Sequence, residues 1–221
     1  MTGFTGRRHG DTHPVRQQVV ELCQDLARRG YFAATGGNLA LRVEADLIAV
    51  TPSATDYYGM QPEDVAVVRL SDLRQVEGNR PPSVETGLHA RLLQARPDCN
   101  CSIHTHQPVA SACTLLGRPL DVSAPRHQQM LGARVPMVGY APSGTRWLAA
   151  KLAKAVRHDI NAYLMRNHGV VCCGPDAGST VARIVALEEL ASEYLRDHIR
   201  ARAATDPSLR PSLQSLLDHF A

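Results

Sequence analysis

Two histidines separated by one residue, His104 and His106, are the side chains of this sequence most suited to bind an ion together. Residues two positions apart on a β-strand point to the same face of the sheet, so both rings can reach one cation. Imidazole nitrogens bind zinc at about 2.0 to 2.1 Å. The pair therefore predicts two ligands of a divalent metal, and the alternative is two polar residues on a solvated strand face.

A carboxylate, Glu85, precedes this pair within the segment PPSVETGLHARLLQARPD. Pro81 and Pro82 cannot continue an upstream helix and Ser83 is a favourable N-cap, so a helix is predicted from there to about Arg96. Glu85 then falls in the first turn, where an acid gains about 0.3 to 1 kcal/mol from the helix dipole without any catalytic role. A proton-transfer role beside a metal is the alternative interpretation.

Two turns rich in small or hydroxyl-bearing residues lie further upstream. Thr35, Gly36 and Gly37 predict a tight turn before Asn38, and the backbone N–H groups of such a turn can bind a phosphate. A second turn, TPSA at residues 51–54, follows a short apolar strand and presents the hydroxyl of Ser53. For the first turn, a plain entry into a hairpin is the alternative.

The apolar pattern predicts the helices and strands that must position these residues. Helices are predicted over residues 14–28, 83–96, 109–116, 147–156, 179–203 and 207–221. Strands are predicted over residues 39–43, 47–50, 65–70, 99–105, 135–140, 162–165 and 170–173. Several strand pairs are joined by turns too short for a parallel crossover. We therefore expect an α/β fold, a single three-layer α/β/α domain with a central mixed, largely antiparallel sheet.

Length and composition favour one domain. A chain of 221 residues with 44% hydrophobic content can bury a full core. Residues 1–13 are polar and rich in Gly and Arg, so they are predicted to form a flexible tail, with the domain over residues 14–221. The six cysteines include no C-x-x-C pair and are expected to be buried free thiols.

Charge and hydropathy exclude two classes of partner. The net charge of +3 is small and only three Phe and one Trp could stack on bases, so no nucleic-acid partner is expected. No apolar run approaches the roughly 18 to 20 residues of a membrane span, and a signal-peptide core is missing, so no membrane partner is expected and the protein should be cytoplasmic.

Five short motifs follow one another along the chain: GGN ending at Asn38, VTPS at residues 50–53, PPSVE ending at Glu85, HTH at residues 104–106 and NHG at residues 167–169. Their order and approximate spacing resemble the class II aldolase/adducin family, and within it the L-fuculose-phosphate aldolase-like members. The resemblance covers about residues 15–200.

This resemblance implies a metal site and a homotetramer with its sites at subunit contacts. It implies that a Zn²⁺ ion, or another divalent metal such as Mn²⁺, Co²⁺ or Fe²⁺, is bound by His104, His106 and His168. By the same resemblance Glu85 is the acid/base residue and also closes the metal shell when no substrate is bound. A phosphate pocket is implied at Gly37, Asn38, Ser53 and Ser83.

A divalent metal held by three neutral imidazoles keeps open positions and acts as a Lewis acid toward adjacent hydroxyl and carbonyl oxygens. The expected function is a metal-dependent lyase that cleaves the carbon–carbon bond next to the carbonyl of a small sugar phosphate or related hydroxy-carbonyl compound. A decarboxylase or 4-epimerase on the same scaffold, with or without a phosphate on its substrate, is the alternative. A non-catalytic adducin-like interaction domain is the third interpretation, and the presence of all three histidines and the acid disfavours it.

Some positions depart from the pattern of the family. Val84, Ala54 and Ala40 stand where several sugar-phosphate aldolases carry a serine, a glycine and a serine, which weakens the predicted anion pocket. Some aldolases use a tyrosine of the neighbouring subunit as proton donor near PRHQQML, where this chain offers His127 as a candidate catalytic residue or a surface residue. The epimerases have aspartate where this chain has Glu85, which favours carbon–carbon cleavage.

Overall fold

An eight-stranded sheet forms the centre of the structure, a computed structural model that describes residues 10–32, 36–206 and 208–218. Its strand order is β4-β3-β2-β1-β5-β10-β9-β8. All neighbouring strands are antiparallel except β8 and β9, which are parallel. The predicted mixed, largely antiparallel sheet is therefore confirmed. The strands are β1 (Asn38–Glu44), β2 (Leu47–Val50), β3 (Ala66–Arg69), β4 (Gln75–Glu77), β5 (Cys101–Thr105), β8 (Met137–Val138), β9 (Ala162–Met165) and β10 (Val170–Gly174).

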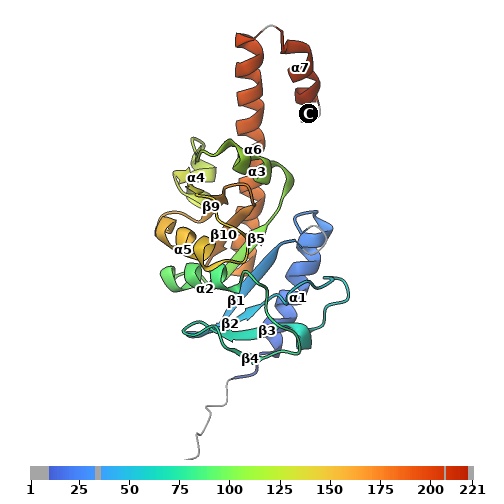
Figure 1. Cartoon of the computed structure of the whole chain (residues 1–221), viewed down its shortest axis with the longest axis vertical. Coiled ribbons are helices and arrows are strands. Elements are labelled where there is room, and N and C mark those ends of the chain that lie inside the picture. Colours follow the sequence, from blue (N-terminus) through green and yellow to red (C-terminus); the bar gives the residue numbers. More distant parts are fainter. Residues whose placement is uncertain (1–9, 33–35, 207, 219–221) are drawn as a thin grey trace, which may run out of the picture.

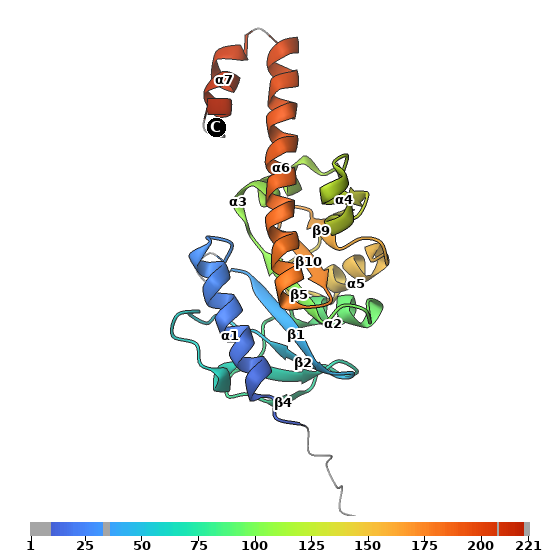
Figure 2. The same ribbon diagram turned by 180° about the vertical axis from the view of Figure 1, so that it is seen from behind.

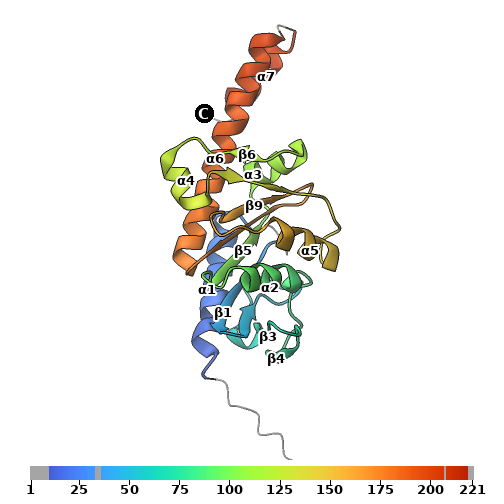
Figure 3. The ribbon, with the colours of Figure 1, turned by 90° about the vertical axis from the view of Figure 1, so that its left-hand side faces the viewer.

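Helices cover both faces of the sheet. Figure 2 shows α1 (His13–Arg28) and α6 (Ala177–Thr205) in front of the strands. In Figure 3, α2 (Thr86–Ala95) and α5 (Arg146–Ala155) lie on the opposite side. Two short helices, α3 (Pro108–Cys113) and α4 (Pro125–Leu131), pack against α6. The long α6 extends beyond the sheet, and α7 (Arg210–Asp218) folds back beside its end (Figure 1).

The side-chain alternation of β5 is the feature of the sheet that matters most for the site. Cys101 and Ile103 belong to the hydrophobic cluster shared with α1 and α6. Ser102 and His104 alternate with them, are fully buried, and face the side of α2, where Ser102 bonds His89. Residues two apart on this strand thus share one face, as expected, but β5 ends at Thr105, so of the predicted pair His104 lies on the strand and His106 directly follows it.

Proline and serine explain two differences from the predicted elements. The strand predicted over residues 135–140 is divided at Pro136, which has no N–H for a ladder. Its first part, β7 (Arg134–Val135), pairs with β6 (Leu120–Asp121), while β8 joins the main sheet. The helix predicted from Ser83 begins only at Thr86, because the Ser83 carbonyl already accepts from the Thr86 N–H at 3.0 Å in a preceding turn.

Short elements without a strong pattern were not predicted: β4, β6 and α4 are two to seven residues long. Of the tail predicted over residues 1–13, residues 1–9 lie outside the described residues, as does Thr35 of the predicted phosphate turn. All six cysteines are free and buried, as expected. Among the described residues, no helix combines the length and the apolar character needed to span a membrane.

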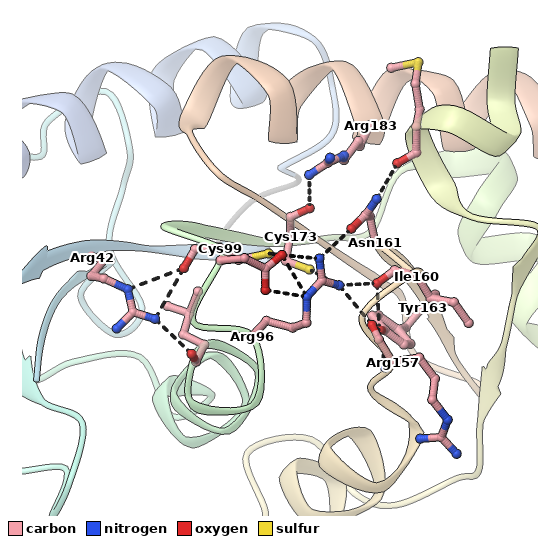
Figure 4. A network of polar contacts seen from close by, with 12 residues as sticks. Arg42, Arg96, Cys99, Arg157, Ile160, Asn161, Tyr163, Cys173 and Arg183 are labelled. Atoms are coloured by element: carbon pink, nitrogen blue, oxygen red, sulfur yellow. Dashed lines mark hydrogen bonds and ion pairs between the residues drawn. The ribbon is translucent and has the colours of Figure 1, made fainter. Parts of the chain in front are cut away.

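Arg96, at the C-terminal end of α2, hydrogen-bonds the segment that leads into β9 (Figure 4). It is 3% exposed, and its guanidinium donates to Oδ2 of Asp98 at 2.7 Å, to the Ile160 carbonyl at 2.6 Å and to Oδ1 of Asn161 at 3.0 Å. The hydrogen bond from Arg96 and its charge lower the pKa of Asp98 to about 2 despite partial burial. The helix that carries Glu85 is thereby anchored at its far end.

Candidate active site

Three histidines from two parts of the chain converge at one end of the sheet. His104 lies on β5, His106 follows that strand directly, and His168 lies in the turn between β9 and β10. One nitrogen from each ring lies within 4.8 Å of the others. The ring centroids are 4.7 to 5.2 Å apart. The structure therefore brings the three predicted ligands together as a group that could hold a metal ion.

The backbone around this cluster is shaped for close contact between the rings. Gly169 lies so near that a Cβ there would be 2.5 Å from Cδ2 of His106 and 2.9 Å from Cε1 of His104. Only glycine fits, because such distances are far below van der Waals contact. Asn167 has a φ of 55°, in the left-handed region that Asn tolerates better than most residues. The NHG motif thus forms the turn that brings His168 to the other two histidines.

The donor set fits a divalent cation. Nδ1 of His104 donates to the Val170 carbonyl at 2.8 Å, which leaves the lone pair of Nε2 facing the cluster. Nε2 of His104 and Nε2 of His106 are 3.0 Å apart, close to the separation of about 3.3 Å expected for two ligands of a tetrahedral zinc. Burial lowers the pKa of His104 to about 3 and also lowers that of His106, which favours the neutral, metal-binding form. Nδ1 of His168 is buried without a hydrogen-bond partner among the described residues.

Glu85 lies against two of the three imidazoles, at the N-cap of α2. Its Oε2 is 3.2 Å from Nε2 of His104, and its Oε1 is 3.4 Å from Nε2 of His168. The side chain is 5% exposed. Burial alone would raise the pKa of this carboxyl, but the hydrogen bonds that Asn38 and Ser143 donate favour its charged form and lower the pKa. Glu85 is therefore the ionised member of the group.

A cavity of about 230 Å³ adjoins the acid and two of the histidines. Seven of the nine residues that the sequence proposed for the site line it: Gly37, Asn38, Ser53, Ser83, Glu85, His106 and His168. The eighth, His104, is completely buried. None of the described residues that line the cavity is Lys or Arg. An anion bound there would rely on neutral donors and a bound metal.

The backbone of the predicted anion pocket is partly committed to other contacts. Gly37 has a φ of 101°, and a Cβ there would meet the ring of Phe32 at 2.3 Å. The Ser53 N–H donates to the Pro81 carbonyl at 2.9 Å. Ala54 has a φ of 46°, so this turn has left-handed geometry without glycine, the residue that adopts it most easily. The hydroxyl of Ser83 accepts from the Glu85 N–H at 3.2 Å.

His127 is the one proposed site residue that, within the chain, lies neither at the cavity nor in the histidine cluster. It lies on α4 and is 2% exposed. Its Nε2 is 3.4 Å from Glu189 and its Nδ1 is 3.9 Å from Glu193, both on α6. Within one chain His127 therefore packs against α6, apart from the histidine cluster.

Sequence reasoning missed two polar partners of the acid. Ser143 donates to Oε1 of Glu85 at 2.8 Å from the loop between β8 and α5, and no local pattern marked it. His89 bonds Asn38, which in turn bonds Glu85. Its position four residues after Glu85 was a usable signal, because residues i and i+4 share one face of a helix.

Comparisons with known proteins agree with this geometry. The Class II Aldolase and Adducin N-terminal domain family matches residues 17–195. The chain is 33% identical over 160 residues to the 5-deoxy-D-ribulose 1-phosphate aldolase of Bacillus thuringiensis, covering 71% of this chain and 72% of that protein. It is 29% identical to the L-fuculose phosphate aldolase of Methanocaldococcus jannaschii over 80% of this chain and 93% of that protein.

A solved structure of L-fuculose 1-phosphate aldolase superposes with a TM-score of 0.79 at 25% identity, covering 97% of this chain and 99% of that one. The agreement therefore extends over almost the whole length of both chains, including the sheet whose strands and turns carry the histidine cluster. With the family match spanning both the HTH and the NHG motifs, the chain belongs to the class II aldolase and adducin N-terminal domain family.

Proposed function

We propose that this protein is a divalent-metal-dependent aldolase-type lyase, which cleaves the carbon–carbon bond next to the carbonyl of a small sugar phosphate or related hydroxy-carbonyl compound. The observation that carries the proposal is the position of Glu85, with one carboxylate oxygen near His104 and the other near His168. An acid held for structural reasons alone would not need contact with two candidate metal ligands. Relatives named as sugar-phosphate aldolases support the same reaction class.

The histidine cluster would hold the ion through His104, His106 and His168. When bound, a Zn²⁺ or similar divalent ion supplies Lewis-acid stabilisation of the negative charge that develops beside the substrate carbonyl. The side chains of this chain supply the remaining parts of the reaction. Nδ1 of His104 is fixed by the Val170 carbonyl, so its ring orientation does not change during turnover.

Glu85 is the group proposed to move the proton. The ionised carboxylate borders the cavity, so it can accept a proton from a substrate hydroxyl or carbon and return it to the product. Ser143 and Asn38 hold one carboxylate oxygen each, which keeps the charge in place before substrate binds.

The absence of Lys and Arg among the described cavity-lining residues favours a second candidate. A phosphate in this cavity would be held by neutral donors such as the hydroxyls of Ser53 and Ser83. A decarboxylase or 4-epimerase acting on a non-phosphorylated hydroxy-carbonyl compound needs no cation at that position. The same metal and acid serve such a reaction, because it also develops negative charge next to a carbonyl.

A homotetramer with its sites at subunit contacts belongs to the proposal. Two exposed apolar side chains support a subunit contact there. Val84 lines the cavity and is 69% exposed, and it also lines a neighbouring hollow together with Trp147 on α5, which is 73% exposed. Exposed apolar groups that adjoin one another are typical of interfaces. The molar mass in solution, measured by light scattering after gel filtration, tests the assembly.

The experiment that tests the function is a cleavage assay on the zinc-loaded protein with a panel of ketose 1-phosphates, read by the release of dihydroxyacetone phosphate. Chelator should abolish the release and added Zn²⁺, Co²⁺ or Mn²⁺ should restore it. Release that is unaffected by chelator would contradict the metal-dependent reaction. If the same metal-loaded protein instead releases carbon dioxide from a non-phosphorylated keto acid, or epimerises a ketose without cleaving it, the second candidate is favoured.

A further inference from the structure

A continuous chain of hydrogen bonds runs from β5 to the carboxylate of Glu85. Ser102 Oγ is 2.8 Å from Nδ1 of His89. Nε2 of His89 is 2.6 Å from Oδ1 of Asn38, and Nδ2 of Asn38 is 2.9 Å from Oε2 of Glu85. All four side chains are buried. Neither ring nitrogen of His89 is left without a partner.

The direction of every bond in this chain follows from the acid. Asn38 presents its NH₂ group to Glu85, since its Nδ2 donates to the carboxylate oxygen Oε2. The amide oxygen then points to His89 and requires a donor there. His89 must therefore carry its proton on Nε2, and its Nδ1 accepts from the hydroxyl of Ser102. Each group along the chain has one orientation.

The four side chains of this hydrogen-bond chain lie on the same helix and strands as the residues of the candidate site. Glu85 and His89 are four residues apart at the start of α2, so their side chains lie on one face of the helix. Asn38 begins β1 and pairs with His104 across the sheet, while Ser102 lies two residues before His104 on β5. The hydrogen-bond chain thus links α2, which carries Glu85, to β1 and β5 beside the histidine cluster.

We propose that His89 is a positioning residue, which fixes the Asn38 amide and through it holds Glu85 in place for proton transfer. Ser102 selects the tautomer of His89 that can do this. Burial also lowers the pKa of His89 to about 4, so the ring is neutral and keeps one donor and one acceptor. The effect of His89 on turnover rests on the proposed function, whereas the hydrogen bonds from Ser102 to Glu85 do not depend on it.

A purely structural role is the alternative, since His89 is fully buried and any change to it would cost stability. Two substitutions distinguish the two roles. In His89→Gln, the amide nitrogen comes near the position of Nε2 and can still donate to Asn38. In His89→Asn, the shorter side chain cannot reach Asn38. Both replace the ring by an amide, so both disturb the packing of the core.

The kinetic arm uses the metal-loaded variants. His89→Asn should lower kcat by about 10- to 100-fold with little change in KM and with metal still bound, and His89→Gln should recover most of kcat. In an Asn38→Ala background the same His89→Asn change should lower kcat no further, because His89 acts through Asn38. Equal losses of kcat in His89→Gln and His89→Asn, or additive losses with Asn38→Ala, would overturn the proposal.

The second arm needs no activity. Nitrogen-15 NMR of histidine-labelled protein should show His89 as the Nε2–H tautomer, with Ser102→Ala admitting the Nδ1–H form. A crystal structure of His89→Asn should show the Asn38 amide rotated and its contact with Glu85 broken. An Nδ1–H tautomer in the unaltered protein, or an undisturbed Asn38–Glu85 contact in the variant, would overturn the proposal. If both results hold but no substrate is cleaved, the positioning chain stands and the proposed function fails.

Discussion

Asn38 donates a hydrogen bond from its amide nitrogen to Oε2 of Glu85 over 2.9 Å, inside the candidate site. Sequence reasoning gave these residues separate tasks, substrate binding for Asn38 and proton transfer for Glu85. In the structure both tasks involve the hydrogen bond between Asn38 and Glu85. The orientation of the Asn38 amide is set on its other side by His89, which bonds the amide oxygen. One N–H of the Asn38 amide is engaged by the carboxylate, so its second N–H is the one available to a ligand in the adjoining cavity, and substrate binding should depend on the acid that orients this amide.

Replacing Glu85 by Gln should separate metal binding from turnover. The amide has the size of the carboxylate and can still accept from Asn38, but it transfers no proton at neutral pH. Turnover should fall by about 10² to 10⁴-fold, with roughly one metal ion per chain retained. Steady-state kinetics and elemental analysis of the same sample measure both quantities.

The matched control is Glu21→Gln, which changes an exposed acid on α1 far along the sequence from the site. It should leave turnover and metal content unchanged. Turnover of Glu85→Gln at the level of the unaltered protein would remove Glu85 from its proposed role.

The histidine cluster predicts the outcome of removing single ligands. His106→Ala or His168→Ala should reduce bound metal well below one ion per chain and abolish activity, because two imidazoles do not hold the ion as three do. The fold should survive, since the hydrophobic clusters on both faces of the sheet do not depend on these rings. Elemental analysis and circular dichroism measure the two effects.

His158→Ala is the control for these variants, since His158 is exposed and lies outside the cluster. It should keep full metal content. Full occupancy in both His106→Ala and His168→Ala would disprove the metal assignment.

Sequence patterns located His104 and His106 because strand periodicity directs residues two positions apart to the same side. In the structure β5 ends at Thr105, and His106, directly after it, still joins His104 in the cluster. The sequence patterns also located the sheet, because short apolar runs with tight turns leave no room for parallel crossovers. Ser143 was beyond their reach, since its contact with Glu85 spans 58 residues and depends on how α5 packs beside α2. The surroundings of His127 were equally beyond their reach, since only the packing of α4 on α6 directs its ring to Glu189. Its role toward the site of a neighbouring subunit stays a prediction.

The buried histidines predict how stability depends on pH in the metal-free protein. Burial lowers the pKa of His89 to about 4, whereas an unfolded chain has a histidine pKa of about 6.5. Between these values the unfolded chain binds more protons, so the free energy of unfolding should be greatest above about pH 6.5 and fall as the pH drops toward 4. His104, with its pKa lowered to about 3, acts in the same sense.

Urea denaturation in the presence of chelator, at several pH values from 7.5 to about 4, measures this slope. His89→Gln removes one titrating group, so the slope should decrease by at most about 1.4 kcal/mol per pH unit. The exposed His158→Gln should leave the slope unchanged. An identical slope in His89→Gln and the unaltered protein would show that His89 is not held neutral by the fold.

The last prediction concerns the phosphate. The cavity has hydroxyls at Ser53 and Ser83 but, among the described residues that line it, no Lys or Arg. Charge-assisted hydrogen bonds contribute roughly 1.5 to 3 kcal/mol each, so a few neutral donors can still bind a phosphate. Phosphoglycolohydroxamate should therefore bind the metal-loaded protein more tightly than acetohydroxamate, which has the same metal-binding group and no phosphate. Isothermal titration calorimetry compares the two ligands directly.

Ser53→Ala is the sharper of the two possible serine tests, because the Ser83 hydroxyl also accepts from the Glu85 N–H and its loss would disturb the acid. Ser53→Ala should weaken phosphoglycolohydroxamate by about 10-fold or more and leave acetohydroxamate unchanged. Ser83→Ala should weaken phosphoglycolohydroxamate as well, and its disturbance of Glu85 should also lower turnover. If the phosphate adds no affinity in the unaltered protein, the sugar-phosphate substrate is wrong, and a non-phosphorylated hydroxy-carbonyl compound or keto acid takes its place.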